Sequence, residues 1–179
     1  SDHGEEFFEH EKYEHGHSVF DELLHVPLVV AGGGAARDSR DDTPVSTESI
    51  AATILHFAGF DPGELGVAAE PLPGMGGTGG DRELLSTGTL YGPERFALEN
   101  GRIKYIYTSH RSSGYGGRSL LPPPHYELYD LRTDPEEHRN LVAERPDEVR
   151  RFSQDLLRAV IRGLDGRYFL FLDLPEVAN

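Results

Sequence analysis

The chain has no cysteine among its 179 residues, and no apolar run comes near the roughly 20 residues that a membrane-spanning helix needs. The absence of cysteine excludes disulfides, thiolate metal ligands and a cysteine nucleophile within this sequence. Basic residues are also scarce, because 17 lysines and arginines stand against 31 aspartates and glutamates, for a formal net charge of −14. This balance argues against nucleic acid and against a polybasic membrane-surface role, since both need a basic face.

Hydrophobic residues make up 37% of the sequence and aromatic residues 9%, which is typical of a globular chain with a core of its own. The sequence opens with Ser1-Asp2-His3 and not with methionine. We therefore expect it to be a piece of a longer protein.

The first part of the chain has the pattern of an α/β layer. A continuous apolar run over residues 25–31, followed by a glycine triplet, predicts a buried parallel strand. Residues 46–58 predict a helix with an apolar face, capped by Ser46 or Thr47 and ended by Gly59. Residues 1–60 are therefore interpreted as the end of an α/β domain, and the Gly- and Pro-rich residues 61–83 as a linker.

The second part, residues 84–179, predicts an antiparallel sheet packed on a long helix. Asn100-Gly101 between the runs 96–99 and 102–107 is typical of a hairpin turn, and residues 126–131 alternate like a half-buried strand. Residues 168–172 predict a last strand. Residues 147–164 form an amphipathic helix, and the side chains expected in the core share one face: Val149, Phe152, Leu156, Leu157, Val160, Ile161 and Leu164.

Asp2 and His3 are the first candidate metal ligands. Neighbouring residues on a regular strand point to opposite faces, so both reach one ion only where the strand ends and the backbone turns, which Gly4 permits. A carboxylate oxygen with an imidazole nitrogen favours Zn²⁺ or Mn²⁺ over Ca²⁺, which prefers oxygen ligands. The alternative interpretation is a solvated acidic segment with an incidental histidine.

Three motifs in order resemble the sulfatase family, within the alkaline phosphatase superfamily. The first is SDHGEEF at residues 1–7 with EHGHS at 14–18 and FDELLHVPL at 20–28. The second is the helix from Val45 to Gly59, and the third is ELYDLRTDPEE at 127–137 followed by Asn140-Leu141. The resemblance implies the fold class: α/β, a C-terminal fragment of an alkaline-phosphatase-like α/β/α sheet followed by a small antiparallel sheet packed on a long C-terminal helix.

The resemblance also implies residue roles. Asp2 and His3 match the family's two late ligands of a divalent metal, Ca²⁺, Mn²⁺ or Zn²⁺, and His3 stands where many sulfatases have asparagine. His17 falls where many members place a lysine on the sulfate or phosphate oxygens, and His15 matches a phosphate-binding histidine of phosphoethanolamine-transferase relatives. His15 and His17 are therefore the catalytic candidates, as donors to the ester oxygens or to the leaving group.

The loop at residues 109–124 offers further candidates for substrate binding, because loops often carry specificity. They are His110, Arg111 and Arg118, with His125 just beyond the loop. His10 and His25 are interpreted as structural, or as partners behind the residues that touch the substrate.

The nucleophile of such an enzyme is not in this chain. In sulfatases it is a formylglycine made from cysteine or serine far upstream, so formylglycine is expected only in the missing part. The leading hypothesis is the C-terminal part of a metal-dependent sulfatase that is inactive alone. Its expected partners are a sulfate or phosphate ester and the missing N-terminal half or a second copy of the chain. The alternatives are a phosphodiesterase, phosphonate hydrolase or phosphoethanolamine transferase on the same scaffold, and a non-catalytic binding or assembly module.

Overall fold

The computed structural model describes residues 1–32, 35, 38–79, 83–112 and 125–163, with the side chains of residues 110–112 excepted. The described residues form two compact units. One, called here the α2 unit, contains Ser1–Asp2 and Pro27–Leu84; the other, called the sheet unit, contains His3–Val26 and the described residues from Leu85 onward. The domain boundaries expected at residues 60 and 84 stay a prediction.

The α2 unit is built around helix α2, Glu48–Phe57, which confirms the helix expected over residues 46–58. A short 3-10 turn, η1, spans Gly63–Leu65. Thr53 connects the helix to the loop beyond it, because its hydroxyl donates to the Ser49 carbonyl at 2.6 Å and accepts the Leu72 N–H at 2.8 Å. This buried polar contact fixes the loop at Leu72 against the helix.

The strand expected over residues 25–31 is wrong. Residues 26–31 carry no strand in the structure, and Val29 is 89% exposed. A buried parallel strand needs neighbours that pair with its backbone on both sides, and no strand pairs with this run among the described residues. The Pro27 carbonyl instead accepts a hydrogen bond from the Ser1 amine at 3.0 Å.

The sheet unit contains a four-stranded sheet with the order β3-β4-β5-β6. Its strands are β3 Leu84–Thr87, β4 Pro93–Glu99, β5 Ile103–Ser112 and β6 His125–Asp130. β5 pairs antiparallel with both β4 and β6. At the β4–β5 turn the Asn100 side-chain oxygen accepts the N–H groups of Arg102 and Ile103 at 3.2 and 2.8 Å, and Gly101 has a φ of +77°. These contacts confirm the expected hairpin.

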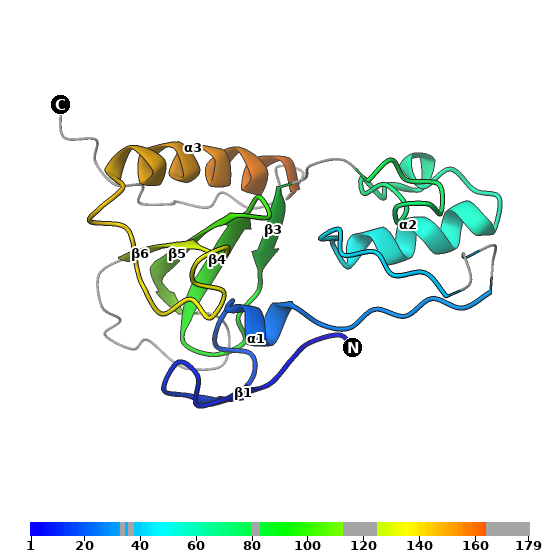
Figure 1. Cartoon of the computed structure of the whole chain (residues 1–179). Coiled ribbons are helices and arrows are strands. Elements are labelled where there is room, and N and C mark those ends of the chain that lie inside the picture. Colours follow the sequence, from blue (N-terminus) through cyan, green and yellow to red (C-terminus); the bar gives the residue numbers. More distant parts are fainter. Residues whose placement is uncertain (33–34, 36–37, 80–82, 113–124, 164–179) are drawn as a thin grey trace. The chain divides into compact units, whose positions relative to one another are not determined.

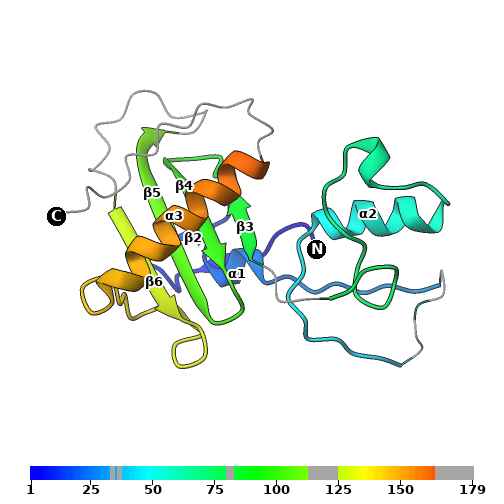
Figure 2. The ribbon, with the colours of Figure 1, turned by 90° about the horizontal axis from the view of Figure 1, so that it is seen from above.

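Helix α3, Pro146–Gly163, lies along one face of this sheet, as Figure 1 shows from the side and Figure 2 from above. This confirms the antiparallel sheet packed on a long helix. Ile161, expected in the core, is 61% exposed, so the buried stripe is narrower than the pattern suggests. The core between helix and sheet consists of Phe96, Leu98, Ile103, Tyr105, Tyr107, Leu128, Leu141, Val149, Phe152, Leu156, Ala159 and Val160.

The opposite face of the sheet is covered by residues from His3–Val26, the segment that carries most of the chain's unusual chemistry. This segment holds β1 Glu6–Phe7, β2 Tyr13–Glu14 and α1 Asp21–Leu24. Val19 and Phe20 pack against Ala97, Ile106 and Tyr129 of the sheet. In both views α1 lies on the side of the sheet away from α3 (Figures 1 and 2).

The last strand expected at residues 168–172 lies outside the described residues. Within the part of the chain that the structure describes, no helix combines the length and the apolar character needed to cross a bilayer.

Candidate active site: a histidine and carboxylate segment on the sheet

The segment His3–Val26 is called here the site segment. Gly4 fixes the position of its first residues. Its N–H donates to the Leu23 carbonyl at 2.9 Å. A Cβ at this position would lie 1.9 Å from the backbone oxygen of Glu22, which is far inside any allowed contact. Only glycine lets the two backbones approach this closely, so the segment is locked against α1 from its beginning.

Glu6 organises the loop that follows. Its side chain is buried, and one carboxylate oxygen accepts the N–H groups of His10 and Lys12, each at 3.1 Å. The other carboxylate oxygen lies 2.7 Å from Nε2 of His17. A buried carboxylate with these three partners is satisfied by hydrogen bonds, so Glu6 sets both the shape of the loop and the position of His17.

His10 is fixed by three contacts, two through its ring nitrogens and one through its ring face. Its Nδ1 lies 2.7 Å from Oε1 of Glu22, its Nε2 lies 3.3 Å from the Glu137 carbonyl, and its ring stacks on Phe20 at 3.7 Å. Burial lowers the pKa of His10, but the hydrogen bond and charge of Glu22 outweigh it, and the net pKa is raised. These contacts support the interpretation of His10 from sequence as a residue that stabilises the structure.

Lys104 forms ion pairs with two carboxylates, those of Asp21 in α1 and of Glu137. Its fully buried Nζ is 2.6 Å from Oδ1 of Asp21 and 2.9 Å from Oε1 of Glu137. Oε2 of Glu137 accepts the Asp21 N–H at 2.7 Å. Burial raises the pKa of Glu137 to about 7, although the Lys104 charge opposes this shift. Glu137 thereby ties the 127–137 motif to the site segment.

The structure brings His3 and His15 together. Their rings stack at 4.0 Å, and Nδ1 of His15 lies 3.2 Å from Oε2 of Glu5. His17 is more enclosed, with a side chain that is 12% exposed and paired with Glu6. Asp2 is exposed, and its sharing of a cation with His3 stays a prediction.

The remaining candidates for substrate binding are His110, Arg111, Arg118 and His125. His110 and Arg111 belong to β5 but their side chains are not described, and Arg118 lies outside the described residues. His125 begins β6, and its Nε2 lies 3.6 Å from Oε2 of Glu127. Their roles in substrate binding stay predictions.

Two groups in the sheet unit place three potential metal-ligand atoms within 4.8 Å of one another. They are His3 with Glu5 and His15, and Glu6 with His10 and Glu22. The fit of a divalent cation to the first group is good, because imidazole nitrogen and carboxylate oxygen are the donors that Zn²⁺ and Mn²⁺ take. The Asp2 and His3 side chains offer the same pair of donor types.

The sequence reasoning missed four buried or half-buried charges that shape the site: Glu6, Glu22, Lys104 and Glu137. One signal was available. Lys104 is one of two lysines in the chain and stands in an apolar strand, where a buried lysine needs an acidic partner. The identity of that partner, Glu137, follows only from the fold.

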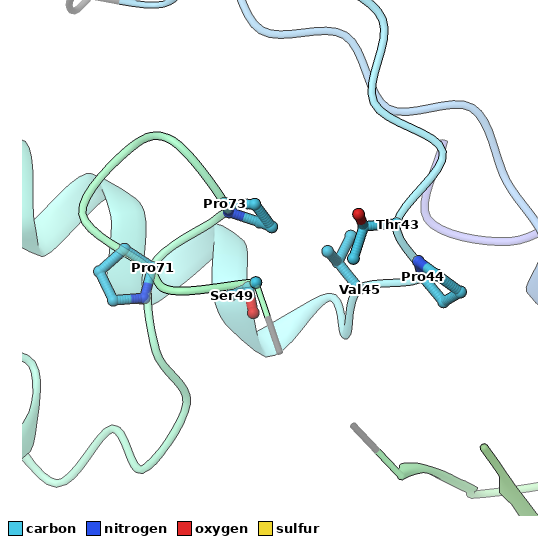
Figure 3. Close-up of a pocket in the computed structure, with 7 residues that line it drawn as sticks. Thr43, Pro44, Val45, Ser49, Pro71 and Pro73 are labelled. Carbon is cyan, nitrogen blue, oxygen red and sulfur yellow. The ribbon is translucent and has the colours of Figure 1, made fainter. Parts of the chain in front are cut away.

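The α2 unit has a pocket of its own, lined by Thr43, Pro44, Val45, Ser49, Pro71, Pro73 and Gly79 (Figure 3). None of these lining residues carries a charge. The pocket therefore offers no acid, base or metal ligand, and the sheet unit remains the better candidate for chemistry.

Comparison with known proteins shows what the chain is similar to. No family model matches the chain. Arylsulfatase K of Rattus norvegicus is 29% identical over 173 residues, which cover 90% of this chain and 28% of that protein. Arylsulfatase K of Bos taurus is 28% identical over 172 residues, covering 90% and 30%. The chain thus spans less than a third of the length of these curated relatives.

Among solved structures, the structure of BT4656 in complex with its substrate D-glucosamine-2-N,6-O-disulfate is similar with a TM-score of 0.43 and 17% identity, covering 66% of this chain and 23% of that chain. The two arylsulfatases match nearly the whole chain. They confirm the resemblance predicted from the three motifs: this chain is similar in sequence to arylsulfatase K, over a stretch that corresponds to less than a third of that protein.

Proposed function

We propose that this chain is the C-terminal part of a metal-dependent sulfatase that hydrolyses sulfate esters. Two findings support the proposal. Relatives with arylsulfatase in their names match 90% of the chain. The observation that carries it is the segment on the sheet, where His10, His15 and His17 each lie within hydrogen-bonding distance of a carboxylate.

Asp2 and His3 are the proposed ligands of a divalent cation, which is Ca²⁺, Mn²⁺ or Zn²⁺. A cation bound there supplies Lewis-acid stabilisation of charge on the ester oxygens. His3 makes a further contact of its own, because its Nδ1 lies 2.8 Å from the Gly4 carbonyl. A carbonyl only accepts, so this nitrogen carries the proton and the other one carries the lone pair.

His15 and His17 are the proposed catalytic residues. The buried Glu6 carboxylate holds His17 at 2.7 Å, and Glu5 holds His15 at 3.2 Å. A carboxylate on one ring nitrogen fixes the orientation of an imidazole. The second nitrogen of such a ring can donate to a non-bridging ester oxygen or protonate the leaving alcohol.

The attacking nucleophile is proposed to come from the part of the enzyme outside these residues. The chain has no cysteine, and the resemblance places the residue that becomes formylglycine, a cysteine or serine, far upstream of the motifs at residues 1–28. We therefore propose that the chain alone turns over no ester, and that it acts with the rest of the catalytic domain.

The test is an assay of two polypeptides against an aryl sulfate and an aryl phosphodiester. The first is this chain, and the second is a polypeptide of the relatives' length that ends in it. We expect no hydrolysis by the chain, and preferential hydrolysis of the aryl sulfate by the longer polypeptide. Preference for the phosphodiester would assign the phosphodiesterase alternative, and inactivity of the longer polypeptide on both esters would assign a binding module.

A further inference from the structure

Arg95, on β4, is a part-buried cation that forms no ion pair with any described residue. Its guanidinium donates one hydrogen bond, from Nη1 to the Ser18 hydroxyl at 3.4 Å, and lies 5.8 Å from the centre of the Phe20 ring. Its Nε is buried and has no hydrogen-bond partner among the described residues. Because a buried N–H of a charged group is costly without an acceptor, Arg95 indicates a partner that the described residues do not supply.

Thr108, on β5, has a second buried polar atom of this kind. It is the register partner of both Arg95 on β4 and His125 on β6. Residues directly opposite one another in an antiparallel sheet share a face, with Cβ atoms about 4.5–5.5 Å apart. Thr108 is 1% exposed, and its Oγ1 lacks a hydrogen-bond partner within the described part of the chain. Two neighbouring side chains on one face of the sheet therefore have unused donors.

The face that carries these donors is the one covered by the site segment. Ala97 and Ile106, two positions away along β4 and β5, pack against Phe20. Side chains alternate along a strand, so Arg95 and Thr108 continue the same face. His125, at the far end of the row, has a side chain that is 44% exposed. The row is therefore buried at Thr108 and open to solvent at His125.

The donors suit an oxyanion. Nη1 of Arg95 already donates to Ser18, which leaves the edge formed by Nε and Nη2. Two parallel N–H groups on one edge of a guanidinium bind two oxygens of a carboxylate, sulfate or phosphate group. The Thr108 hydroxyl can donate to one of these oxygens as well. The arrangement thus offers three donors to one anionic group.

Glu127, on β6, opposes an anion at this row. Burial raises its pKa, but the neighbouring His125 and the charge of Arg95 outweigh this, and the net pKa is lowered. Its Oε1 accepts the Tyr129 hydroxyl at 3.2 Å, and its Oε2 lies 3.6 Å from Nε2 of His125. Glu127 is therefore a charge that an anion near Arg95 must feel, and its removal provides a test in the opposite direction.

We propose that Arg95 and Thr108 form a binding site for an oxyanion, which is a sulfate, phosphate or carboxylate group. The inference goes beyond the proposed function, because none of Asp2, His3, His15 and His17 supplies a donor and binding requires neither a metal nor a nucleophile. The chain has a formal net charge of −14, and its overall field repels anions. Saturable binding of an anion therefore requires a local site.

The experiment is a titration of the 179-residue chain with sodium sulfate at constant ionic strength, followed by NMR of the arginine Nε–H signals. We expect a saturable shift of the Arg95 signal. The signal of Arg139, which is 71% exposed and paired with Glu144, should not move. Methyl sulfate in a second titration distinguishes two sources of the anion: equal affinity assigns a group carried by an organic ligand, lower affinity assigns a free ion, and either result retains the site.

Four variants measure the contributions to affinity. Arg95→Gln should weaken sulfate binding by about tenfold or more, because a charge-assisted bidentate contact is lost. Arg95→Lys should recover only part, since an ammonium is a point charge. Thr108→Val should weaken binding by about threefold or more. Glu127→Gln should strengthen it by about threefold or more, because an opposing charge is removed.

The matched control is Arg139→Gln, which removes the same charge from an exposed position and should leave the affinity unchanged. Equal weakening by Arg139→Gln and Arg95→Gln would show general electrostatic attraction and overturn the proposal. Unchanged affinity in Glu127→Gln would place the ion away from this row. The titration of the unmodified chain is independent of how the variants fold, and the absence of a saturable shift at Arg95 contradicts the site.

Discussion

The two faces of the β3–β6 sheet are built from alternate residues of the same strands, yet they differ in kind. On β5, Tyr105 and Tyr107 point into the apolar core under α3. Lys104, between Ile103 and Tyr105, instead makes ion pairs with Asp21 and Glu137 under the site segment. One face is packed with aromatic and aliphatic side chains, and the other combines a small apolar cluster with buried charges.

This difference indicates that the two faces contribute differently to stability and to the positions of side chains. Apolar cores tolerate substitutions that keep volume and pattern. Buried ion pairs contribute little net stability but strongly penalise the loss of one partner. The charged face carries the histidines, so the positions of the proposed site residues depend on contacts with defined geometry. Breaking each face separately tests this division.

The largest effect is expected from Lys104→Met on the charged face. Removal of the ammonium leaves Glu137 and Asp21 buried or half-buried without their cation, and should lower the free energy of unfolding by about 3–5 kcal/mol. Urea denaturation measures the change. Adding Glu137→Gln to Lys104→Met should recover part of the loss, and a single variant as stable as the unmodified chain would show that the ion pairs do not form.

A similar or slightly smaller effect is expected from Leu156→Ala on the apolar face. Leu156 is fully buried between α3 and the sheet, and its truncation should cost about 2–5 kcal/mol. Ile161 on the same helix is 61% exposed and provides the matched control. Ile161→Ala should stay within about 0.5 kcal/mol, and equal losses at both positions would place the helix in a different rotation.

A pH-dependent effect is expected from Glu137. Because its pKa is raised from 4.5 to about 7, the folded state binds more protons than the unfolded state between these values, and stability falls as pH rises through this window. Glu137→Gln should flatten the slope of unfolding free energy against pH. The raised pKa of His10 acts in the same direction only above its ordinary value of 6.5, and burial of Glu99 raises its pKa from 4.5 as well. An unchanged slope below pH 6.5 in the variant would therefore contradict the raised pKa of Glu137 and assign the dependence to Glu99.

The smallest effect is expected at the hairpin that both faces share. Asn100→Ala removes one acceptor of two backbone N–H groups and should cost about 1 kcal/mol. Asn100→Asp keeps an acceptor oxygen and is the matched control. Thermal unfolding measures both, and a loss as large as that of Leu156→Ala would mean that the turn does more than close the hairpin.

Local pattern was enough to predict α2, the Asn100–Gly101 hairpin and α3, because each depends on residues close in sequence. The strand at 25–31 failed, since an apolar run becomes a strand only where other strands pair with it. In the site, too, local motifs could be recognised from the sequence, whereas contacts between distant residues could not. The motif at residues 1–7 was enough to indicate His3 as a site residue. The ion pair between Lys104 and Glu137 joins residues 33 positions apart, so it could be identified only from the structure.

Sulfate-ester hydrolysis by a polypeptide of the relatives' length, compared between His17→Ala and His25→Ala, tests the central claim most directly. His17 is paired with the buried Glu6, whereas His25 is exposed at the end of α1. The account predicts that His17→Ala lowers kcat/KM by about 100-fold or more, while His25→Ala stays close to the unmodified enzyme. Equal activity of the two folded variants would contradict a catalytic role for the histidines on the charged face.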